Sequence, residues 1–403
     1  MQRLLPRRHT PRGRVRPVAP AIRYSTATTA RPAFDPALYI EGARQRVAQR
    51  APKVIYDHLS PTHSRLLDLA LAPHLPAECQ SSAAGPDTAD GAWDDDGPVA
   101  ALPPGHHLVY FPRQVGPPDG LMPDGTDRDH WPGGPFVRRM WAGGSVRWRH
   151  GVQAGAAMRL DGSPAWCVET VGEPVWKEGK GPGDDKVFVD VMRRYGPARH
   201  QDRLLGPARL GPRAFARHQA DAGLAHIEET RKLVFLRPRE EAVGAANSAA
   251  AKTVPARQAA DSSFVLRPDA PLLFHFSALS YNAHAIHLDP GYARAHEGHA
   301  DLLVHGPLTL VLLLAAVRAE LGRLRGRDGR ARGRTRWRVG RLDYRNLAPL
   351  YAGRELRVCW RRGEGCDARA DEGRQAKMHV WIEGPAGGLA VKGRAELEPC
   401  GHR

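Results

Sequence analysis

The chain has 403 residues, of which 42% are hydrophobic and 25% charged, and its formal net charge is +16. This length favours two domains over one small core, and no run of about 18 uncharged apolar residues is present that would predict a membrane-spanning helix. The five cysteines are scattered without Cys-x-x-Cys spacing. That pattern argues against a disulfide framework and a zinc site, and it favours a reducing compartment.

The amino terminus has a composition of its own. Residues 1–34 carry eight arginines and neither lysine nor acid, and the first carboxylate is Asp35. Without those arginines, 51 basic residues stand against 43 acidic ones. An arginine-rich, acid-free segment with Ser and Thr is typical of a mitochondrial transit peptide, and the alternative is a disordered basic tail. We therefore expect the mature chain in the mitochondrial matrix.

Residues 35–238 form the first predicted domain. Residues 81–100, rich in Asp, Gly, Ala and Ser, are predicted to be a flexible insertion, and residues 116–134, dense in Gly, Pro and Asp, a loop. Four segments combine β-branched or aromatic residues with interleaved polar residues, which predicts half-buried strands. These segments are residues 107–111, 165–171, 186–191 and 226–236.

Residues 239–270 are predicted to be a linker, since residues 239–262 are small, polar and without periodicity. The second predicted domain spans residues 271–403. Pro307 suits a first helical position, and an apolar helix is predicted from Leu308 to Leu324. Four strands are predicted to follow, at residues 334–342, 355–361, 377–383 and 389–397. One buried helix followed by four strands is typical of a sheet wrapped around a helix.

Several segments carry a family resemblance. His287-Leu288-Asp289-Pro290, followed by Val304-His305-Gly306-Pro307, resembles the active-site region of MaoC-like hydratases and dehydratases. The stretches 102–112, 123–126 and 136–145 resemble the amino-terminal half of the mitochondrial 3-hydroxyacyl-thioester dehydratase type 2 family, which is related to mesaconyl-CoA hydratases. The resemblance implies an α+β double hot-dog fold, with two antiparallel sheets each wrapped around a helix.

The same resemblance implies an activity. The chain is expected to be a hydro-lyase that reversibly dehydrates (R)-3-hydroxyacyl thioesters to trans-2-enoyl thioesters in mitochondrial type II fatty-acid synthesis. Its substrate would be carried by acyl carrier protein or coenzyme A, and no cofactor is implied. A short dicarboxylyl-CoA hydratase of the mesaconyl-CoA type is the alternative within the same class. Two hot dogs in one chain allow a monomer as well as a homodimer.

The family motif places an Asp five positions before the catalytic histidine, where this chain has Asn282. We assign His287 as the general base, because the unperturbed pKa of histidine, roughly 6.5, lies near working pH. An amide does not exchange a proton, so Asn282 is expected to hold the hydroxyl or a water. The backbone N–H of Gly306, at the positive end of the predicted helix, is expected to stabilise the thioester oxygen.

Two neighbouring residues receive weaker assignments. His284 is a candidate second proton carrier, with a hydrogen-bonded structural histidine as the competing interpretation. Asp289 is expected to cap a short helix at 290–295. The pairs 284/287 and 296/299 are spaced as His-x-x-His, but no thiolate accompanies them, so no metal is predicted.

Basic residues leave further alternatives open. Arg294, Arg318 and Arg345 are candidates for attracting an acidic carrier or the phosphates of coenzyme A, and solvated surface arginine is the competing interpretation for each. The tract 323–338 raises the alternative of nucleic-acid binding. It lies between a predicted helix and a predicted strand, so an exposed loop is favoured and no nucleic acid is predicted. A non-catalytic, acyl-binding hot-dog subunit is the third possibility, motivated by Asn282.

Overall fold

The structure is a computed structural model. The residues that it describes are 34–81, 100–116, 120–150, 158–180, 183–198, 209, 211–221, 223–238, 254–256, 258–325, 337–363 and 375–400. Except for Phe34, the predicted transit peptide lies outside these ranges, as do residues 82–99 of the predicted insertion. Residues 239–253 and 257 of the predicted linker and residues 326–336 of the arginine tract lie outside them too.

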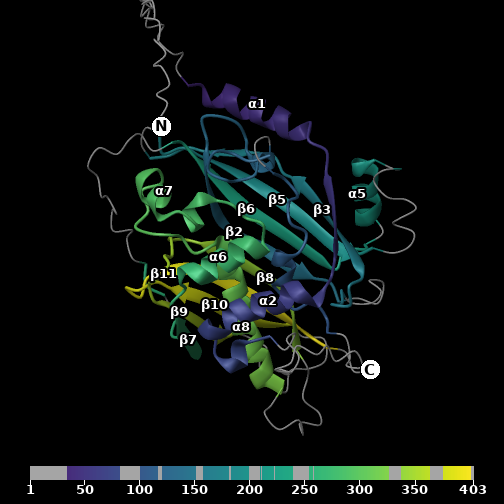
Figure 1. Ribbon diagram of the computed structural model, residues 1–403, viewed down its shortest axis with the longest axis vertical. Helices are drawn as coiled ribbons and strands as arrows, with labels where there is room; N and C mark the ends of the chain where they lie inside the picture. Colours follow the sequence, from purple (N-terminus) through teal and green to yellow (C-terminus); the bar gives the residue numbers. More distant parts are fainter. Residues whose placement is uncertain are drawn as a thin grey trace, which may run out of the picture. The chain divides into compact units, whose positions relative to one another are not determined.

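The first half of the fold contains three helices and six strands among the described residues (Figure 1). Its strands follow the alternation that the sequence predicts: in β5 the side chains of Val187, Val189 and Val191 are buried, and the residues between them are partly exposed. The elements are α1 (Pro36–Ala48), β1 (Lys53–His58), α2 (Pro61–Leu71), β2 (Arg138–Trp148), β3 (Pro164–Val171), β4 (Val175–Lys177), β5 (Lys186–Pro197), α5 (Pro212–Asp221) and β6 (Ile227–Leu236).

Within the described residues, the second half consists of a strand, two short helices, a long helix and four antiparallel strands. Its first helix begins with Pro271 in its first turn and with the Asp269 carboxylate accepting a hydrogen bond from Leu272 N, at 2.9 Å. The elements are β7 (Ser262–Leu266), α6 (Ala270–Leu279), α7 (Pro290–Ala295), α8 (Gly306–Arg325), β8 (Trp337–Asn346), β9 (Leu356–Arg362), β10 (Ala376–Glu383) and β11 (Leu389–Pro399). The predicted strands and the predicted apolar helix of this half are confirmed.

The two halves share one antiparallel sheet. Its strand order is β1-β3-β5-β6-β2-β8-β11-β10-β9-β7, and β4 pairs with β5 beside this path. The join is the pairing of β2 with β8, where Gly144 lies opposite Tyr344 and Val146 opposite Leu342. Backbone hydrogen bonds therefore run from one half into the other.

The second half wraps its sheet around α8. From Leu308 to Val317 the helix is buried on every side, and it packs against inward-facing residues of β8, β9 and β10 such as Leu342, Val358 and Val380. A helix that is apolar all round is stable only when it is enclosed in this way. Truncating one of these leucines to alanine costs about 2–5 kcal/mol in comparable cores.

The expectation of a helix inside each sheet is correct for the second half only. Among the described residues of the first half, the inner face of the sheet is covered by a short 3-10 turn at His106–Val109, by aromatic residues packed under α1, and by charged side chains. The Gly- and Pro-rich sequence before β2 explains the difference, because it does not sustain a long helix.

The predicted strand at 107–111 is wrong. Leu108 and Val109 belong to the 3-10 turn, and Phe111 has a φ of 56°, which ends any extended conformation. All five side chains are buried, and the Tyr110 hydroxyl donates to Ser60 O. Tertiary packing into the shared core has overridden the β-forming composition of this segment.

The second half begins earlier than residue 271. Strand β7 pairs with β9, with Phe264 opposite Val358, so β7 and the first residue of α6, Ala270, fall inside the range predicted as linker. A strand of five residues is too short to stand out by periodicity from the polar stretch before it.

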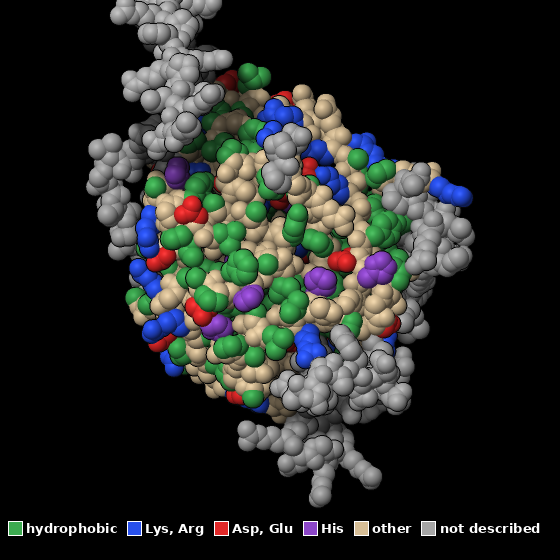
Figure 2. Space-filling model, in the orientation of Figure 1, with side chains coloured by type: hydrophobic (Ala, Val, Ile, Leu, Met, Phe, Trp, Pro, Cys, Tyr) green, Lys and Arg blue, Asp and Glu red, His purple; other side chains and the backbone are tan. Residues whose placement is uncertain are grey.

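The surface shown in Figure 2 lies over α2, α6 and α7. Hydrophobic and histidine side chains are scattered over this face, and the lysines and arginines lie mainly toward its edge. Leu69 and Phe274, each more than half exposed, belong to α2 and α6. In the part of the chain that the structure describes, no helix combines the length and the apolar content that crossing a bilayer requires.

Candidate active site

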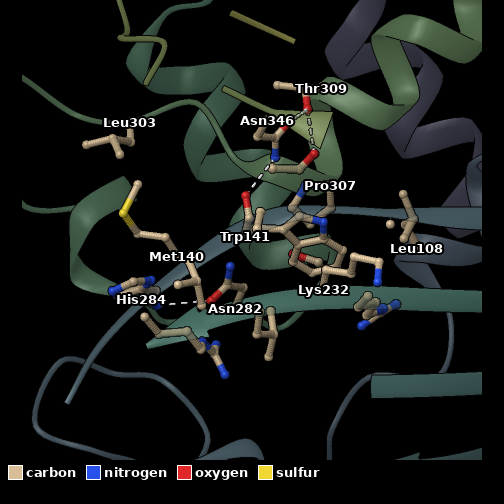
Figure 3. Close-up of a pocket in the computed structure, with 18 of the residues that line it drawn as sticks. Leu108, Met140, Trp141, Lys232, Asn282, His284, Leu303, Pro307, Thr309 and Asn346 are labelled. Carbon is tan, nitrogen blue, oxygen red and sulfur yellow. Dashed lines mark hydrogen bonds between the residues drawn. The ribbon is translucent and has the colours of Figure 1, made fainter. Parts of the chain in front are cut away.

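A cavity of about 1050 Å³ opens where the two halves meet. The first half contributes residues of β2 and β6, including Met140, Trp141 and Lys232 (Figure 3). The second half contributes the segment 280–287 and the start of α8. Most of the residues that the motif marks therefore face one space.

His287 lies on this cavity and is 6% exposed. Its Nδ1 is 2.8 Å from Leu303 O. Because a carbonyl oxygen only accepts, Nδ1 carries the proton and Nε2 keeps its lone pair. Burial lowers the pKa of His287 to about 4, against the opposing effect of the Leu303 hydrogen bond. The ring is therefore neutral at physiological pH, which is the form that a general base requires.

The imidazole of His305 packs against the ring of His287. His305 stacks on it with ring centroids 3.7 Å apart and planes inclined by 21°. Ser277 Oγ lies 2.8 Å from His305 Nε2, and Phe276 packs at 5.0 Å from the same ring. Burial, followed by the proximity of His287 and His284, lowers the pKa of His305 well below its usual value. His287 is thus fixed in orientation by its stacking partner and its hydrogen bond.

His284 meets a carboxylate from the other half. Its ring is 5.5 Å from that of His287, edge to face, and its Nε2 lies 3.6 Å from Asp124 Oδ2. Asp124 is 6% exposed, and its other oxygen accepts from Thr126 N and Oγ1. Burial, followed by the neighbouring His287 and Arg139, lowers the pKa of His284 well below its usual value. His284 is therefore neutral, and it lies beside the carboxyl group of Asp124.

The loop that carries Asp124 packs closely against residues 283–285. Asp124 O accepts from Ala285 N at 2.8 Å, and Gly125 has a φ of +81°. A Cβ at Gly125 would lie 2.0 Å from Ala283 O, so only glycine allows this approach. The first half thereby sets the position of residues 283–285.

Asn282 borders the cavity, and its side chain stabilises the local turn. Its Oδ1 accepts from His284 N at 3.1 Å (Figure 3). The preceding residue, Tyr281, has a φ of 51°, a strained conformation of the kind that often accompanies functional loops. Among the described residues no partner is recorded for Asn282 Nδ2, which leaves that donor available to the cavity.

Gly306 begins α8 with its backbone against Trp141 of β2. A Cβ at this position would lie 2.6 Å from Trp141 Cβ and Cγ. Within the described ranges the Gly306 N–H has no recorded hydrogen-bond acceptor, as expected for the first turn of a helix. The positive end of α8 and a free donor therefore face the cavity beside His287.

Trp141 is itself held on several sides. Its carbonyl accepts from Asn346 Nδ2 at 2.9 Å, and Asn346 Oδ1 accepts from Thr309 Oγ1 at 3.3 Å (Figure 3). Its indole N–H donates to the Tyr344 hydroxyl at 2.8 Å. These bonds join β2, β8 and α8 at the point where the oxyanion donor is expected.

The first-half side of the cavity adjoins a largely buried ionic network, which we call the ionic wall. Glu169 pairs with Arg113, Arg193 and His130, at 2.7, 3.2 and 3.0 Å. Burial alone would raise the pKa of this carboxyl, but His130 and Arg193 outweigh burial and lower it. The members of the ionic wall are Lys53, Arg113, Asp127, Asp129, His130, Arg139, Glu169 and Arg193.

The remaining predicted residues lie in different places. Asp289 Oδ1 accepts from Tyr292 N at 3.0 Å, in the N-cap position of α7. Arg294 pairs with Asp301 on the surface, and Arg318 is partly buried, donating to Cys79 O at 2.9 Å. Of the three predicted arginines only Arg345 borders the cavity.

Several functional candidates escaped the sequence analysis. Asp124, Trp141 and Arg139 come from the first half, and their proximity to His287 follows only from the way in which the halves meet. The stretches 123–126 and 136–145 contained them as part of the family resemblance, without a role. In the described part of the chain, no group of three or more His, Cys, Asp or Glu residues is arranged to hold a metal ion.

Comparison with known proteins agrees with this geometry. The family model of hydroxyacyl-thioester dehydratase type 2 matches residues 105–195 and 210–352. A mesaconyl-C(4)-CoA hydratase of Chloroflexus aurantiacus is 29% identical over 332 residues, which cover 80% of this chain and 91% of that protein. A mitochondrial hydroxyacyl-thioester dehydratase type 2 of Schizosaccharomyces pombe is 25% identical over 318 residues, covering 77% and 90%.

Among solved structures, a MaoC-like dehydratase of Phytophthora capsici aligns over 89% of this chain and 99% of its own, with 14% identity and a TM-score of 0.47. The family match covers more than half of the sequence. It includes the first-half loop with Asp124 and the second-half segment with His287 and Gly306. The chain therefore belongs to the hydroxyacyl-thioester dehydratase type 2 family, and it is a hydro-lyase with a double hot-dog fold.

Proposed function

We propose that the chain reversibly dehydrates (R)-3-hydroxyacyl thioesters to trans-2-enoyl thioesters in mitochondrial fatty-acid synthesis. The observation that carries the proposal is the pairing, across one cavity, of a neutral His287 with the unengaged N–H of Gly306. A base and an oxyanion donor on one cavity are what proton abstraction beside a thioester carbonyl requires.

His287 Nε2 removes the C2 proton, and the electrons of the C2–H bond form the C2–C3 double bond as the C3–O bond breaks. The imidazolium then returns the proton to the departing hydroxyl, which leaves as water. During this step negative charge develops on the thioester oxygen. A donor such as Gly306 N–H is worth about 2.7–4 kcal/mol to a transition state of this kind.

Asn282 and His284 assist from the same side. Asn282 Nδ2 donates to the C3 hydroxyl, while its Oδ1 holds the turn through His284 N. His284, kept neutral by burial and placed beside Asp124, orients the turn and is the candidate second proton carrier. The names of both relatives support a thioester substrate, carried by acyl carrier protein or coenzyme A. The mitochondrial name of one relative and the arginine-rich amino terminus support the organelle.

The test is the absorbance change on hydration of trans-2-enoyl thioesters of increasing chain length, for wild type and His287→Ala. We expect turnover by the wild type and its loss in the variant. Turnover of the two proteins at equal rates would contradict catalysis by His287. No turnover by the wild type on either carrier would support a non-catalytic acyl-binding subunit.

A second candidate substrate is a short dicarboxylyl-CoA. It is supported by the name of the relative from Chloroflexus aurantiacus and by Arg139, which borders the cavity close enough to lower the pKa of His287. One amino group of Arg139 pairs with Asp127 at 3.0 Å. Fumaryl-CoA carries a carboxylate where crotonyl-CoA carries a methyl group. A higher kcat/KM for fumaryl-CoA than for crotonyl-CoA in wild type, lost in Arg139→Gln, would favour this candidate.

A further inference from the structure

A row of basic side chains crosses the outer face of the second-half sheet, the face turned away from α8. Arg361 on β9 lies opposite His379 on β10, and His379 lies opposite Arg394 on β11. One pair further along, Lys392 on β11 lies opposite Arg345 on β8. We call these five residues the basic row. The four Lys and Arg side chains are exposed, and His379 is partly exposed.

Like charges on directly opposed strand positions destabilise a sheet, and the basic row contains one such pair, Lys392 opposite Arg345, without a neutralising partner among the described residues. Arg345, Lys392, Arg394 and Arg361 have no acidic group within 4 Å among the residues that the structure describes. Asp343 lies opposite Arg394, but both of its oxygens are bound by Arg341, at 2.6 and 2.7 Å. The basic row thus lacks the counter-charge that its own sheet could provide.

The basic row connects the active-site cavity with a second hollow. Arg345, Lys392, Arg394 and His379 border the cavity that contains His287. His379 and Arg394 also border a hollow of about 400 Å³, which Arg361, Arg362, Lys377 and Gln258 complete. The basic row therefore borders both the active-site cavity and a small, strongly basic hollow.

We infer that the basic row binds the phosphates of a coenzyme A thioester and that the hollow holds its 3′-phosphate. Several arginine and lysine donors converging on one small space suit a phosphate group, which accepts charge-assisted hydrogen bonds on each oxygen. The basic row crosses four neighbouring strands spaced about 4.8 Å apart, so it is roughly 14 Å long. The inference rests on the proposed reaction and adds the carrier: a hollow of this size suits a nucleotide phosphate better than the broad surface of a carrier protein.

The test compares crotonyl thioesters of coenzyme A, of dephospho-coenzyme A, which lacks the 3′-phosphate, and of pantetheine, which has no phosphate. We expect wild type to prefer coenzyme A over pantetheine in kcat/KM, and Arg394→Gln to reduce that preference on the order of 10-fold. Arg361→Gln should reduce the preference for coenzyme A over dephospho-coenzyme A. Arg357→Gln is the matched control, since it changes an exposed arginine on the same face of β9 that borders neither hollow.

Direct binding of free coenzyme A, measured by calorimetry, gives a readout independent of turnover. The affinity should fall in Arg394→Gln and remain in Arg357→Gln. Equal preference for the three thioesters in wild type, or equal losses on coenzyme A and pantetheine thioesters in Arg394→Gln, would overturn the inference. So would a loss confined to thioesters of acyl carrier protein, which would make the basic row a protein-docking surface. Turnover of the pantetheine thioester tests the proposed reaction alone, because this substrate has no phosphate. Failure of the phosphate-binding inference can therefore be told apart from failure of the proposed reaction.

Discussion

The two halves share one sheet and use their inner faces in opposite ways. In the second half the face is apolar and enclosed around α8, and the catalytic candidates lie between the end of α6 and the first residue of α8. In the first half the middle of the face is charged: Glu169 and Glu229 are buried with Arg193 and Arg231. The half with the long helix contributes the candidate proton carrier His287, and the other half forms the charged side of the cavity.

The comparison teaches how a helix is replaced. Without a central helix among its described residues, the inner face of the first half requires side chains that satisfy one another, and the ionic wall does so with carboxylates shared between several cations. Such a network depends on every member, because a charge left buried without its partner costs several kcal/mol. The space next to it is available for substrate.

The strongest test of the division of labour is His287→Ala. We expect kcat to fall by about 10²–10⁴-fold, because one proton carrier is lost, while thermal unfolding remains close to wild type. His275→Ala is the control, since His275 is exposed on α6. A comparable fall in activity for both variants would contradict the assignment.

Gly306→Ala tests the junction of the halves. The added Cβ would meet Trp141 at 2.6 Å, so α8 or Trp141 has to shift and the oxyanion donor moves. We expect kcat to fall by about 10²-fold. In the same helix a Cβ at Gly322 meets no heavy atom within 4 Å, so Gly322→Ala should keep wild-type kcat and raise the unfolding temperature slightly. A wild-type kcat for Gly306→Ala would exclude this donor.

Glu169→Gln tests the first half. It leaves Arg113, Arg193 and His130 with one carboxylate fewer in a buried site, so we expect the free energy of unfolding to fall by about 3–5 kcal/mol, measured by urea denaturation. Asp190→Asn is the control: its partner Lys232 is more than half exposed, and such pairs contribute about 0–1 kcal/mol. Equal effects of the two changes would mean that the ionic wall is not a stabilising network.

The two halves are expected to differ in pH dependence, the second half in activity and the first half in stability. The pKa of His287 is lowered to about 4, so its neutral form persists as the pH falls and kcat/KM should decline only near pH 4 rather than near 6.5. Arg231 and His107 outweigh burial and lower the pKa of Glu229 to about 2. Ionised Glu229 therefore contributes to the free energy of unfolding above pH 4.5, and this contribution is lost as the pH falls toward 2. A rate profile with a midpoint near 6.5 would contradict the burial of His287.

The smallest effect is expected at Asn282. A carboxylate can accept the His284 N–H as the amide does, so Asn282→Asp should keep kcat within about 10-fold of wild type, the range that one hydrogen bond spans. Asn282→Ala loses both the turn and the free amide donor and should be slower than Asn282→Asp. Equal rates for the Ala and Asp variants would show that the side chain has no part in the reaction.

The sequence was a good guide wherever local pattern determines structure. The apolar run from Leu308 to Val317 predicts α8, and the alternation in 377–383 and 389–397 predicts β10 and β11. It failed at His107–Phe111, where β-forming residues enter the shared core as a turn. Periodicity describes one face of one element, and this segment is buried on all sides.

The site was predictable in part for the same reason. The motif places His287, Asn282 and Gly306 on one cavity because they lie close in sequence and in the same half. Asp124 and Trp141 lie more than 140 residues away from His287 in the sequence, and only the pairing of β2 with β8 brings them near. Contacts made by tertiary packing leave no local pattern to recognise.

The pairing of β2 with β8 has a consequence for how the asymmetry is maintained. Two separate identical chains joined along such an edge would carry two equivalent sites, and any residue lost from one would be lost from both. Here the partners are covalently linked and differ in sequence, so their association is independent of protein concentration. A mismatched pair cannot form by exchange of subunits, so the inner faces of the two halves can differ permanently.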